Sequence, residues 1–333
     1  MFTTSRFPHF LLAIVSLTLA AAQEPAIRLG MIGLDTSHVI AFTSILNDAS
    51  REDHVPGGKV VAAFKGGSED VEASYSRVDR FTQQLRDEFQ VEIVDTIQAL
   101  CKKVDAVLLE SVDGRPHLEQ AKPVIAAGKP LFIDKPMAGS LQDVIEIFRL
   151  AKEANVPCFS SSSLRYYPSL TELMNRDFGD LKGAISYGPC TIEPHHPDLF
   201  WYGVHPTEAL FAVMGPGCVS VSRVHSPNTD VVTGLWGNGN TGIVYGLRTG
   251  HTPYKVTVFG SKAVIAQEGG GNYAPLVGEI MAFFKSGKPP VTARETVEMF
   301  AFMEAADISK RDDGRSISLH DLIRKEGGSW LLP

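Results

Sequence analysis

A turn that could bind phosphate follows the first apolar run of the chain. The segment Gly33-Leu34-Asp35-Thr36-Ser37-His38 lies where a dinucleotide-binding fold carries G-x-G-x-x-G. Only the first glycine is present, and Asp35 stands where a diphosphate would come closest, so binding requires that Asp35 turns away or that the ligand shifts. Thr36 or Ser37 can cap the following helix, whose N-terminus is a potential anion site. Gly33, Thr36, Ser37 and His38 are therefore candidate cofactor-binding residues, and an ordinary strand–turn–helix is the alternative.

The end of the next apolar run also carries residues that suit a nucleotide. Lys65-Gly66-Gly67-Ser68 follows this run, at the point where an NAD site would offer an acid to the ribose hydroxyls. Lys65 and Ser68 could instead hold the 2′-phosphate of NADP. A solvated glycine-rich loop is the alternative.

A third group of residues could bind a metal ion. His and carboxylate side chains are the usual ligands of Zn²⁺ and related ions, and the chain gathers several of them: Glu193, His195, His196, Asp198, His205, Glu208 and perhaps His251. Their spacing matches no helix-based metal motif, and the prolines among them indicate a loop. We therefore assign no metal and favour a polar loop that faces the substrate.

Short apolar runs that alternate with helical patterns must position these groups. The runs are 27–32, 59–64, 104–109, 130–133 and 156–159. Most lack polar alternation, which is typical of strands buried on both faces of a parallel sheet. Between them, Ser140 can cap a helix over 141–155, and another helix runs from about His117 to Ala127 and stops at Gly128. This α/β pattern predicts a Rossmann-like, doubly wound parallel sheet with a ligand crevice at the carboxyl ends of its strands.

The second half of the chain predicts a different sheet. Stretches rich in Val, Ile, Tyr and Thr are separated by Gly, Asn and Pro, as strands and turns are; they cover 183–187, 219–224, 231–236, 242–247 and 255–259. A late helix carries Val297, Ala301, Ala305 and Ile308 on one stripe, which is suited to cover a sheet. We expect an α+β domain with a mixed or antiparallel sheet over residues 158–333, after a nucleotide-binding domain over 23–157.

Composition excludes some functions, and the N-terminus predicts export. The 333 residues carry 31 basic and 38 acidic side chains, a net charge of −7, which argues against nucleic acid as a partner. Residues 1–22 have one positive charge, a short apolar run and small residues near Ala22, the layout of a signal peptide. We expect cleavage before Gln23, an exported protein (periplasmic or extracellular) and no stable membrane insertion. Four widely spaced cysteines favour buried thiols over a metal or redox motif.

The middle of the sequence resembles the Gfo/Idh/MocA family of oxidoreductases. The resemblance covers about Ile27 to Leu322, and these segments carry it: a strand and loop ending in His117, a helix closing on Ala-Gly-Lys, Asp134-Lys135-Pro136, Arg165-Tyr166-Tyr167-Pro168, and Gly203-Val204-His205-Pro206-Thr207-Glu208. It implies hydride transfer between a sugar-like alcohol and NAD or NADP. It also implies oligomerisation through the open sheet of the second domain.

The resemblance implies roles for individual residues. Lys135 and His205 would handle the proton of the substrate hydroxyl, Ser111, Asp134 and Lys135 would contact the cofactor, and the substrate would meet Arg165, Tyr166, Trp201, Tyr202 and Glu208. The family commonly has an Asp where this chain has Trp201, which cannot exchange a proton but can stack on a sugar ring.

Three functions therefore remain open from the sequence. The first is an exported NAD(P)-dependent oxidoreductase that acts on a sugar or sugar derivative. The second is an exported carbohydrate-active enzyme of the same fold with non-redox chemistry, either elimination or hydrolysis. The third is a carbohydrate-binding protein without catalysis. We favour the first because Lys135 and His205 are both present.

Overall fold

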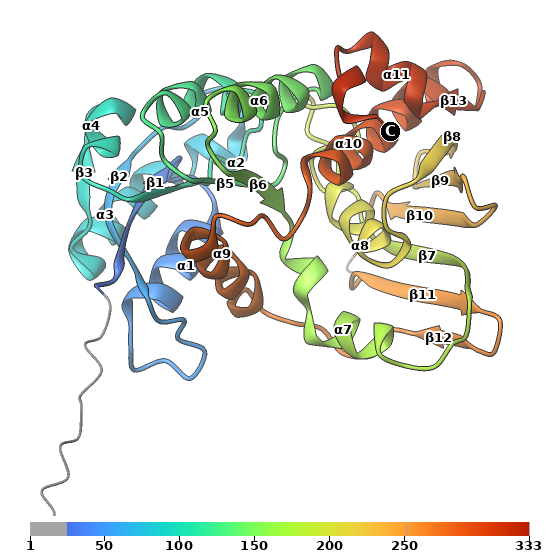
Figure 1. Cartoon of the computed structure of the whole chain (residues 1–333), viewed down its shortest axis with the longest axis horizontal. Coiled ribbons are helices and arrows are strands. Elements are labelled where there is room, and N and C mark those ends of the chain that lie inside the picture. Colours follow the sequence, from blue (N-terminus) through green and yellow to red (C-terminus); the bar gives the residue numbers. More distant parts are fainter. Residues whose placement is uncertain (1–24, 251, 333) are drawn as a thin grey trace, which may run out of the picture.

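The computed structural model describes residues 25–250 and 252–332 (Figure 1). The predicted signal peptide and His251 lie outside this range. Within it, no helix combines the length and the apolar character needed to cross a membrane.

The first domain is built on a parallel sheet of six strands. In chain order the strands are β1 (Ile27–Ile32), β2 (Gly58–Phe64), β3 (Glu92–Val94), β4 (Ala106–Leu109), β5 (Leu131–Asp134) and β6 (Cys158–Ser161). Their order in space is β3-β2-β1-β4-β5-β6, and every neighbouring pair is parallel. The order reverses between β1 and β4, which is where doubly wound sheets bind ligands. The predicted Rossmann-like sheet is confirmed.

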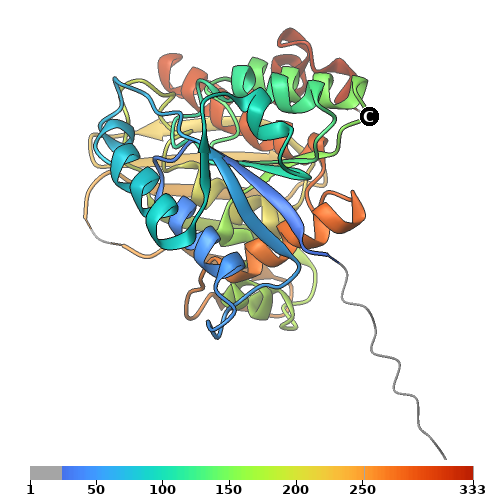
Figure 2. The ribbon, with the colours of Figure 1, turned by 90° about the vertical axis from the view of Figure 1, so that its left-hand side faces the viewer.

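Helices cover both faces of this sheet (Figure 2). They are α1 (Ser37–Asn47), α2 (Glu72–Tyr75), α3 (Val78–Phe89), α4 (Ile97–Cys101), α5 (His117–Ala126) and α6 (Leu141–Glu153). Ser140 caps α6 as predicted, because its hydroxyl accepts a hydrogen bond from the Asp143 N–H at 3.1 Å. Apolar residues of α4, α5 and α6 pack on one face of the sheet, and those of α1 and α3 pack on the other.

The second domain is built on a mixed sheet of seven strands. They are β7 (Leu181–Pro189), β8 (Cys218–His225), β9 (Thr229–Trp236), β10 (Thr241–Leu247), β11 (Lys255–Gly260), β12 (Val264–Ala266) and β13 (Ile317–Ser318), in the order β12-β11-β7-β10-β9-β8-β13. Only β7 and β10 are parallel neighbours; the other pairs are antiparallel. The predicted α+β domain with a mixed sheet is confirmed.

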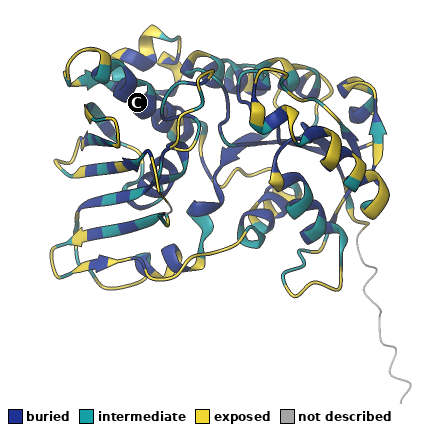
Figure 3. Cartoon of the chain, turned by 180° about the vertical axis from the view of Figure 1, so that it is seen from behind, coloured by how far each residue is buried: buried dark blue, intermediate teal, exposed yellow. Residues whose placement is uncertain are grey.

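Helices cover one face of the second sheet and leave the other open. The helical elements are η1 (Ser163–Tyr166), α7 (Pro168–Met174), α8 (Val204–Met214), α9 (Ala274–Ser286), α10 (Ala293–Arg311), α11 (Leu319–Lys325) and η2 (Ser329–Leu331). Helices α8 and α10 pack on the covered face, where Val232, Val244 and Val258 are buried. By register, Leu235, Tyr245 and Phe259 share the opposite face and are exposed. Buried positions alternate with less buried ones along these strands (Figure 3). The predicted oligomerisation through this open face stays a prediction, which the mass of the purified protein in solution tests.

The chain crosses between the two sheets more than once. Strand β6 ends at Ser161, beyond the expected boundary at residue 157. Helix α9 then returns from the second domain and lies beside α1 (Figure 2), where Leu276 and Ile280 join the apolar core of the first domain. The chain therefore connects the two domains both before β7 and after β12.

A buried arginine anchors the second domain. The guanidinium of Arg223 is fully buried and donates hydrogen bonds to Asp230 at 2.7 Å, Asp307 at 2.5 Å and Asp198 at 2.9 Å. Asp198 lies in the loop after β7, and Asp307 lies on α10. One side chain thus ties the sheet, a loop and the covering helix together.

Replacing this arginine tests its contribution to stability. We expect Arg223→Met to lower the free energy of unfolding by about 3–5 kcal/mol, because Asp307 would keep a buried charge without a partner and Asp230 would lose one of its two arginine partners. Urea unfolding followed by circular dichroism measures the change. Lys262→Ala is the control, because Lys262 pairs with Asp177 on the exposed surface. This control should change the free energy of unfolding by less than about 1 kcal/mol. Equal effects of the two variants would contradict the assignment.

Candidate functional site

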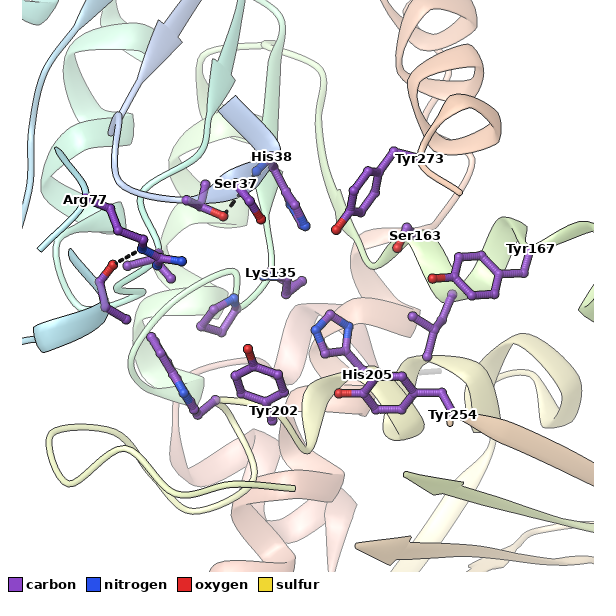
Figure 4. Close-up of a pocket in the computed structure, with 16 residues that line it drawn as sticks. Ser37, His38, Arg77, Lys135, Ser163, Tyr167, Tyr202, His205, Tyr254 and Tyr273 are labelled. Atoms are coloured by element: carbon purple, nitrogen blue, oxygen red, sulfur yellow. Dashed lines mark hydrogen bonds between the residues drawn. The ribbon is translucent and has the colours of Figure 1, made fainter. Parts of the chain in front are cut away.

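A cavity of about 340 Å³ opens at the carboxyl ends of β1 and β5, between the two domains (Figure 4). Both domains contribute to its wall, which consists of Thr36, Ser37, His38, Ala73, Arg77, Val112, Lys135, Pro136, Ser163, Leu164, Tyr167, Trp201, Tyr202, His205, Tyr254 and Tyr273. Seven residues singled out from the sequence lie here together: Thr36, Ser37, His38, Lys135, Trp201, Tyr202 and His205.

The turn between β1 and α1 forms one end of the cavity. Gly33 has φ +81°, and a Cβ there would lie 2.5 Å from the backbone of Ser111, so only glycine fits. The Thr36 hydroxyl accepts a long hydrogen bond from the His38 N–H at 3.4 Å and caps α1, as predicted. The N-terminus of α1 therefore faces the cavity.

Asp35 does not obstruct this turn. Its carboxylate is fully buried and accepts hydrogen bonds from the Val112 N–H at 2.9 Å and the Ser74 hydroxyl at 2.5 Å. Burial raises the pKa of Asp35, and these two hydrogen bonds oppose the rise. Asp35 thus joins β1 to the loop after β4 and to α2, and it is absent from the wall of the cavity.

A buried acid, Asp134, lies beside Lys135 and His38. The Asp134 carboxylate is 2.7 Å from Nδ1 of His38 and 3.7 Å from Nζ of Lys135. Burial is the largest influence on the pKa of Asp134 and acts to raise it, but His38 and Lys135 together hold this pKa below its usual value. His38 also packs against the ring of Tyr273 at 4.6 Å, which brings the start of α9 to the cavity. The prediction that His38 and Asp134 contact a cofactor stays a prediction, and the structure adds the bond between them.

His205 stands across the cavity from this group (Figure 4). It lies in the first turn of α8, its Nδ1 is 2.8 Å from the Ser162 hydroxyl, and its ring is 5.2 Å from that of Tyr254. Burial, followed by the positive charge of Lys135, holds the pKa of His205 well below its usual value. The imidazole is therefore neutral near pH 7, with Nδ1 engaged by Ser162 and Nε2 left for a ligand.

Three predicted substrate residues lie behind the cavity wall. Arg165 bonds to Glu208 through Nε and lies 2.7 Å from Glu295, and Glu208 also accepts a hydrogen bond from Ser161 at 2.8 Å. Tyr166 packs against the apolar core of the first domain. None of the three predicted residues, Arg165, Tyr166 and Glu208, lines the cavity. The structure places them where they support η1 and α8, and their contact with substrate stays a prediction.

The residues expected near the ribose or the phosphates are also engaged with neighbours. Lys65 pairs with Asp79 at 2.6 Å on the surface, and the Ser68 hydroxyl donates to Asp113 at 2.7 Å. The Ser111 hydroxyl donates to Gln120 at 2.9 Å. None of Lys65, Ser68 and Ser111 lines the cavity, so their contact with a nucleotide stays a prediction.

The loop after β7 does not assemble the metal site considered from the sequence. His196 is 3.0 Å from Asp113, and His195 is 2.7 Å from Glu193. Asp198 accepts a hydrogen bond from Arg223. In residues 25–250 and 252–332, the His and carboxylate group compact enough to hold a metal ion is a different one: His38, Glu110 and Asp134.

Sequence reasoning missed several residues of the wall. Arg77 precedes α3, and Tyr254 and Tyr273 precede β11 and α9. Tyr167 stands inside a recognised motif but was not expected to face the site. Each is a single residue whose position depends on how distant elements meet, so no spacing could have indicated it.

Comparisons with known proteins agree with this fold. Residues 27–162 match the family model described as "Oxidoreductase family, NAD-binding Rossmann fold". A search of curated proteins found no match. Among solved structures, a probable dehydrogenase from Thermotoga maritima is similar at 20% identity and TM-score 0.72, covering 89% of this chain and 100% of its own.

Two further structures show the same likeness. Myo-inositol 2-dehydrogenase from Lactobacillus plantarum is similar at 17% identity and TM-score 0.72, covering 88% of this chain and 99% of its own. An oxidoreductase from Agrobacterium radiobacter, solved in complex with NAD⁺, L-tartaric acid and magnesium, is similar at 13% identity and TM-score 0.71, covering 89% and 99%. At these identities the likeness shows the fold. Residues 27–162 thus belong to the Gfo/Idh/MocA family of NAD-binding oxidoreductases, and the two-domain fold of the whole chain is that of its solved dehydrogenases.

Proposed function

We propose that this protein is an NAD(P)-dependent dehydrogenase that oxidises a hydroxyl group of a sugar, a cyclic polyol or a related sugar derivative. One observation carries the proposal: Lys135 from the first domain and the neutral His205 from the second line the same cavity at the carboxyl edge of the parallel sheet. A nicotinamide nucleotide is the ligand that this family's fold binds.

The residues at the start of α1 fit the pyrophosphate of such a nucleotide. The N-terminus of the helix, the hydroxyls of Thr36 and Ser37 and the guanidinium of Arg77 line one end of the cavity, and together they suit an anion. Asp35, the residue that would repel it, is buried and bonded elsewhere. When bound, the nicotinamide ring would accept or return a hydride. Nothing in the cavity wall selects between NAD and NADP.

Lys135 and His205 would manage the proton of the reacting hydroxyl. When Nδ1 of His205 donates to the Ser162 hydroxyl, Nε2 carries the free lone pair and can accept that proton. The Lys135 side chain, held beside Asp134, stands where it can contact the same oxygen as negative charge develops on it. Ser162 and Tyr254 hold the imidazole in place.

The wall of the cavity favours a ring-shaped, hydroxylated substrate. Trp201, Tyr202, Tyr167 and Tyr254 present aromatic faces and phenol groups around one space. Such faces pack on the C–H surface of a sugar ring, while hydroxyl groups of substrate and protein exchange hydrogen bonds. One solved relative of this fold is a myo-inositol 2-dehydrogenase, so cyclic polyols are the first substrates to test.

Substitution of the two proposed proton-handling residues tests this function. We expect Lys135→Ala and His205→Ala each to lower kcat/KM by about 10²–10⁴, because each removes a group placed to handle the proton. The assay follows nucleotide reduction with a panel of inositols, aldoses and sugar acids. Lys262→Ala, on the far surface, is the control. If both variants turn over a good substrate with unchanged kcat/KM, the assignment is wrong.

The pH response of His205 tests the electrostatics of the site. We expect the pKa of this imidazole to lie below the ordinary histidine value of about 6.5, because burial and the positive charge of Lys135 oppose protonation. Ring ¹⁵N chemical shifts measure this without a substrate. Lys135→Ala should raise the pKa of His205, because a neighbouring positive charge is removed. A His205 that protonates at or above its ordinary value in the unsubstituted protein would contradict the account.

A further inference from the structure

Three acidic or imidazole side chains meet beneath the floor of the cavity. Glu110 directly follows β4, Asp134 is the last residue of β5, and His38 lies in the first turn of α1. Because β1, β4 and β5 are consecutive in the sheet, their carboxyl ends bring these side chains together. All three are buried, and one potential ligand atom from each lies within 4.8 Å of the others.

The carboxylates of this cluster have unpaired oxygens. Both side-chain oxygens of Glu110 and Oδ1 of Asp134 are buried and have no hydrogen-bond donor among the described residues. The neighbouring nitrogen atoms are already directed at the remaining oxygen, since His38 Nδ1 is 2.7 Å and Lys135 Nζ 3.7 Å from Oδ2 of Asp134. Buried acceptors in such numbers are unusual, because each one loses its bonds to water without replacement.

A proton on Glu110 does not resolve this arrangement. Burial raises the pKa of Glu110 well above its usual value, which favours protonation. A single proton on Glu110, however, can serve at most two of the three unpaired oxygens and leaves at least one without a partner. A cation placed among the three side chains would satisfy the carboxylate oxygens together.

We propose that His38, Glu110 and Asp134 form a binding site for one divalent cation, at the base of the cavity. One imidazole nitrogen and two carboxylates suit Mn²⁺, Fe²⁺ or Zn²⁺, whereas Ca²⁺ takes six to eight oxygen ligands. The site can be reached from the cavity, because His38 and the adjoining Lys135 are part of its wall.

Metal titration of the purified full chain tests this proposal and needs neither substrate nor nucleotide. The protein is stripped with a chelator and titrated with MnCl₂ and separately with ZnSO₄, using calorimetry, Mn²⁺ electron paramagnetic resonance and the thermal unfolding midpoint. We expect one ion per chain and a rise of several degrees in Tm at saturation.

Glu110→Gln and Asp134→Asn should each weaken binding by at least about tenfold, since each removes an anionic ligand. Glu110→Gln should also remain folded, because it removes a buried carboxylate that has no partner. Glu304→Gln is the matched control: this acid is also partly buried, but it lies outside the cluster and accepts a hydrogen bond from the Leu141 N–H. Loss of binding in both site variants but not in the control supports the site. Absence of saturable binding in the unsubstituted protein, or equal binding by Glu110→Gln, overturns it.

Discussion

The buried hydrogen bond between His38 and Asp134 is the contact on which the site depends. It joins the first turn of α1 to the last residue of β5 across the point where the strand order of the sheet reverses. Lys135 follows Asp134 in the chain, so the bond that fixes this carboxylate also fixes where the lysine leaves the sheet. Tyr273 packs on the other side of His38 and carries α9 back against the first domain. Two domains and one lysine are thus positioned around a single bond of 2.7 Å.

The second domain completes the site through a separate buried network. Arg165 on η1 binds Glu208 on α8 and lies beside Glu295 on α10, so three helical elements meet at one guanidinium. His205 is one turn before Glu208, and its ring is held by Ser162, the residue that follows β6. The aromatic residues of the wall then close the cavity from the same side. The two domains therefore contribute different groups to the cavity. The first supplies a helix N-terminus suited to an anion and a lysine, and the second supplies an imidazole and aromatic side chains suited to a ring.

Much of the architecture could be predicted from the sequence because it follows from local patterns. Uninterrupted apolar runs predicted five of the parallel strands, and Ser140 predicted the start of α6. Strand β3 was missed because Glu92-Ile93-Val94 is three residues long and begins with a charge. Lys135 and His205 were found because they stand in recognisable motifs. Arg165 and Glu208 look like substrate ligands in the same motifs, yet they bind each other across 43 residues of chain. Such pairings depend on how distant elements meet and cannot be read from spacing.

In the proposed function, the start of α1 and Arg77 bind the phosphates of a nicotinamide nucleotide. Calorimetric titration of the purified protein with NAD⁺ and NADP⁺ tests it most directly, with Arg77→Ala compared with Arg80→Ala, an exposed arginine three residues further along the chain. We predict saturable binding of one nucleotide per chain, weakened about tenfold or more by Arg77→Ala and unchanged by Arg80→Ala. The absence of binding of either nucleotide at millimolar concentration would contradict the account.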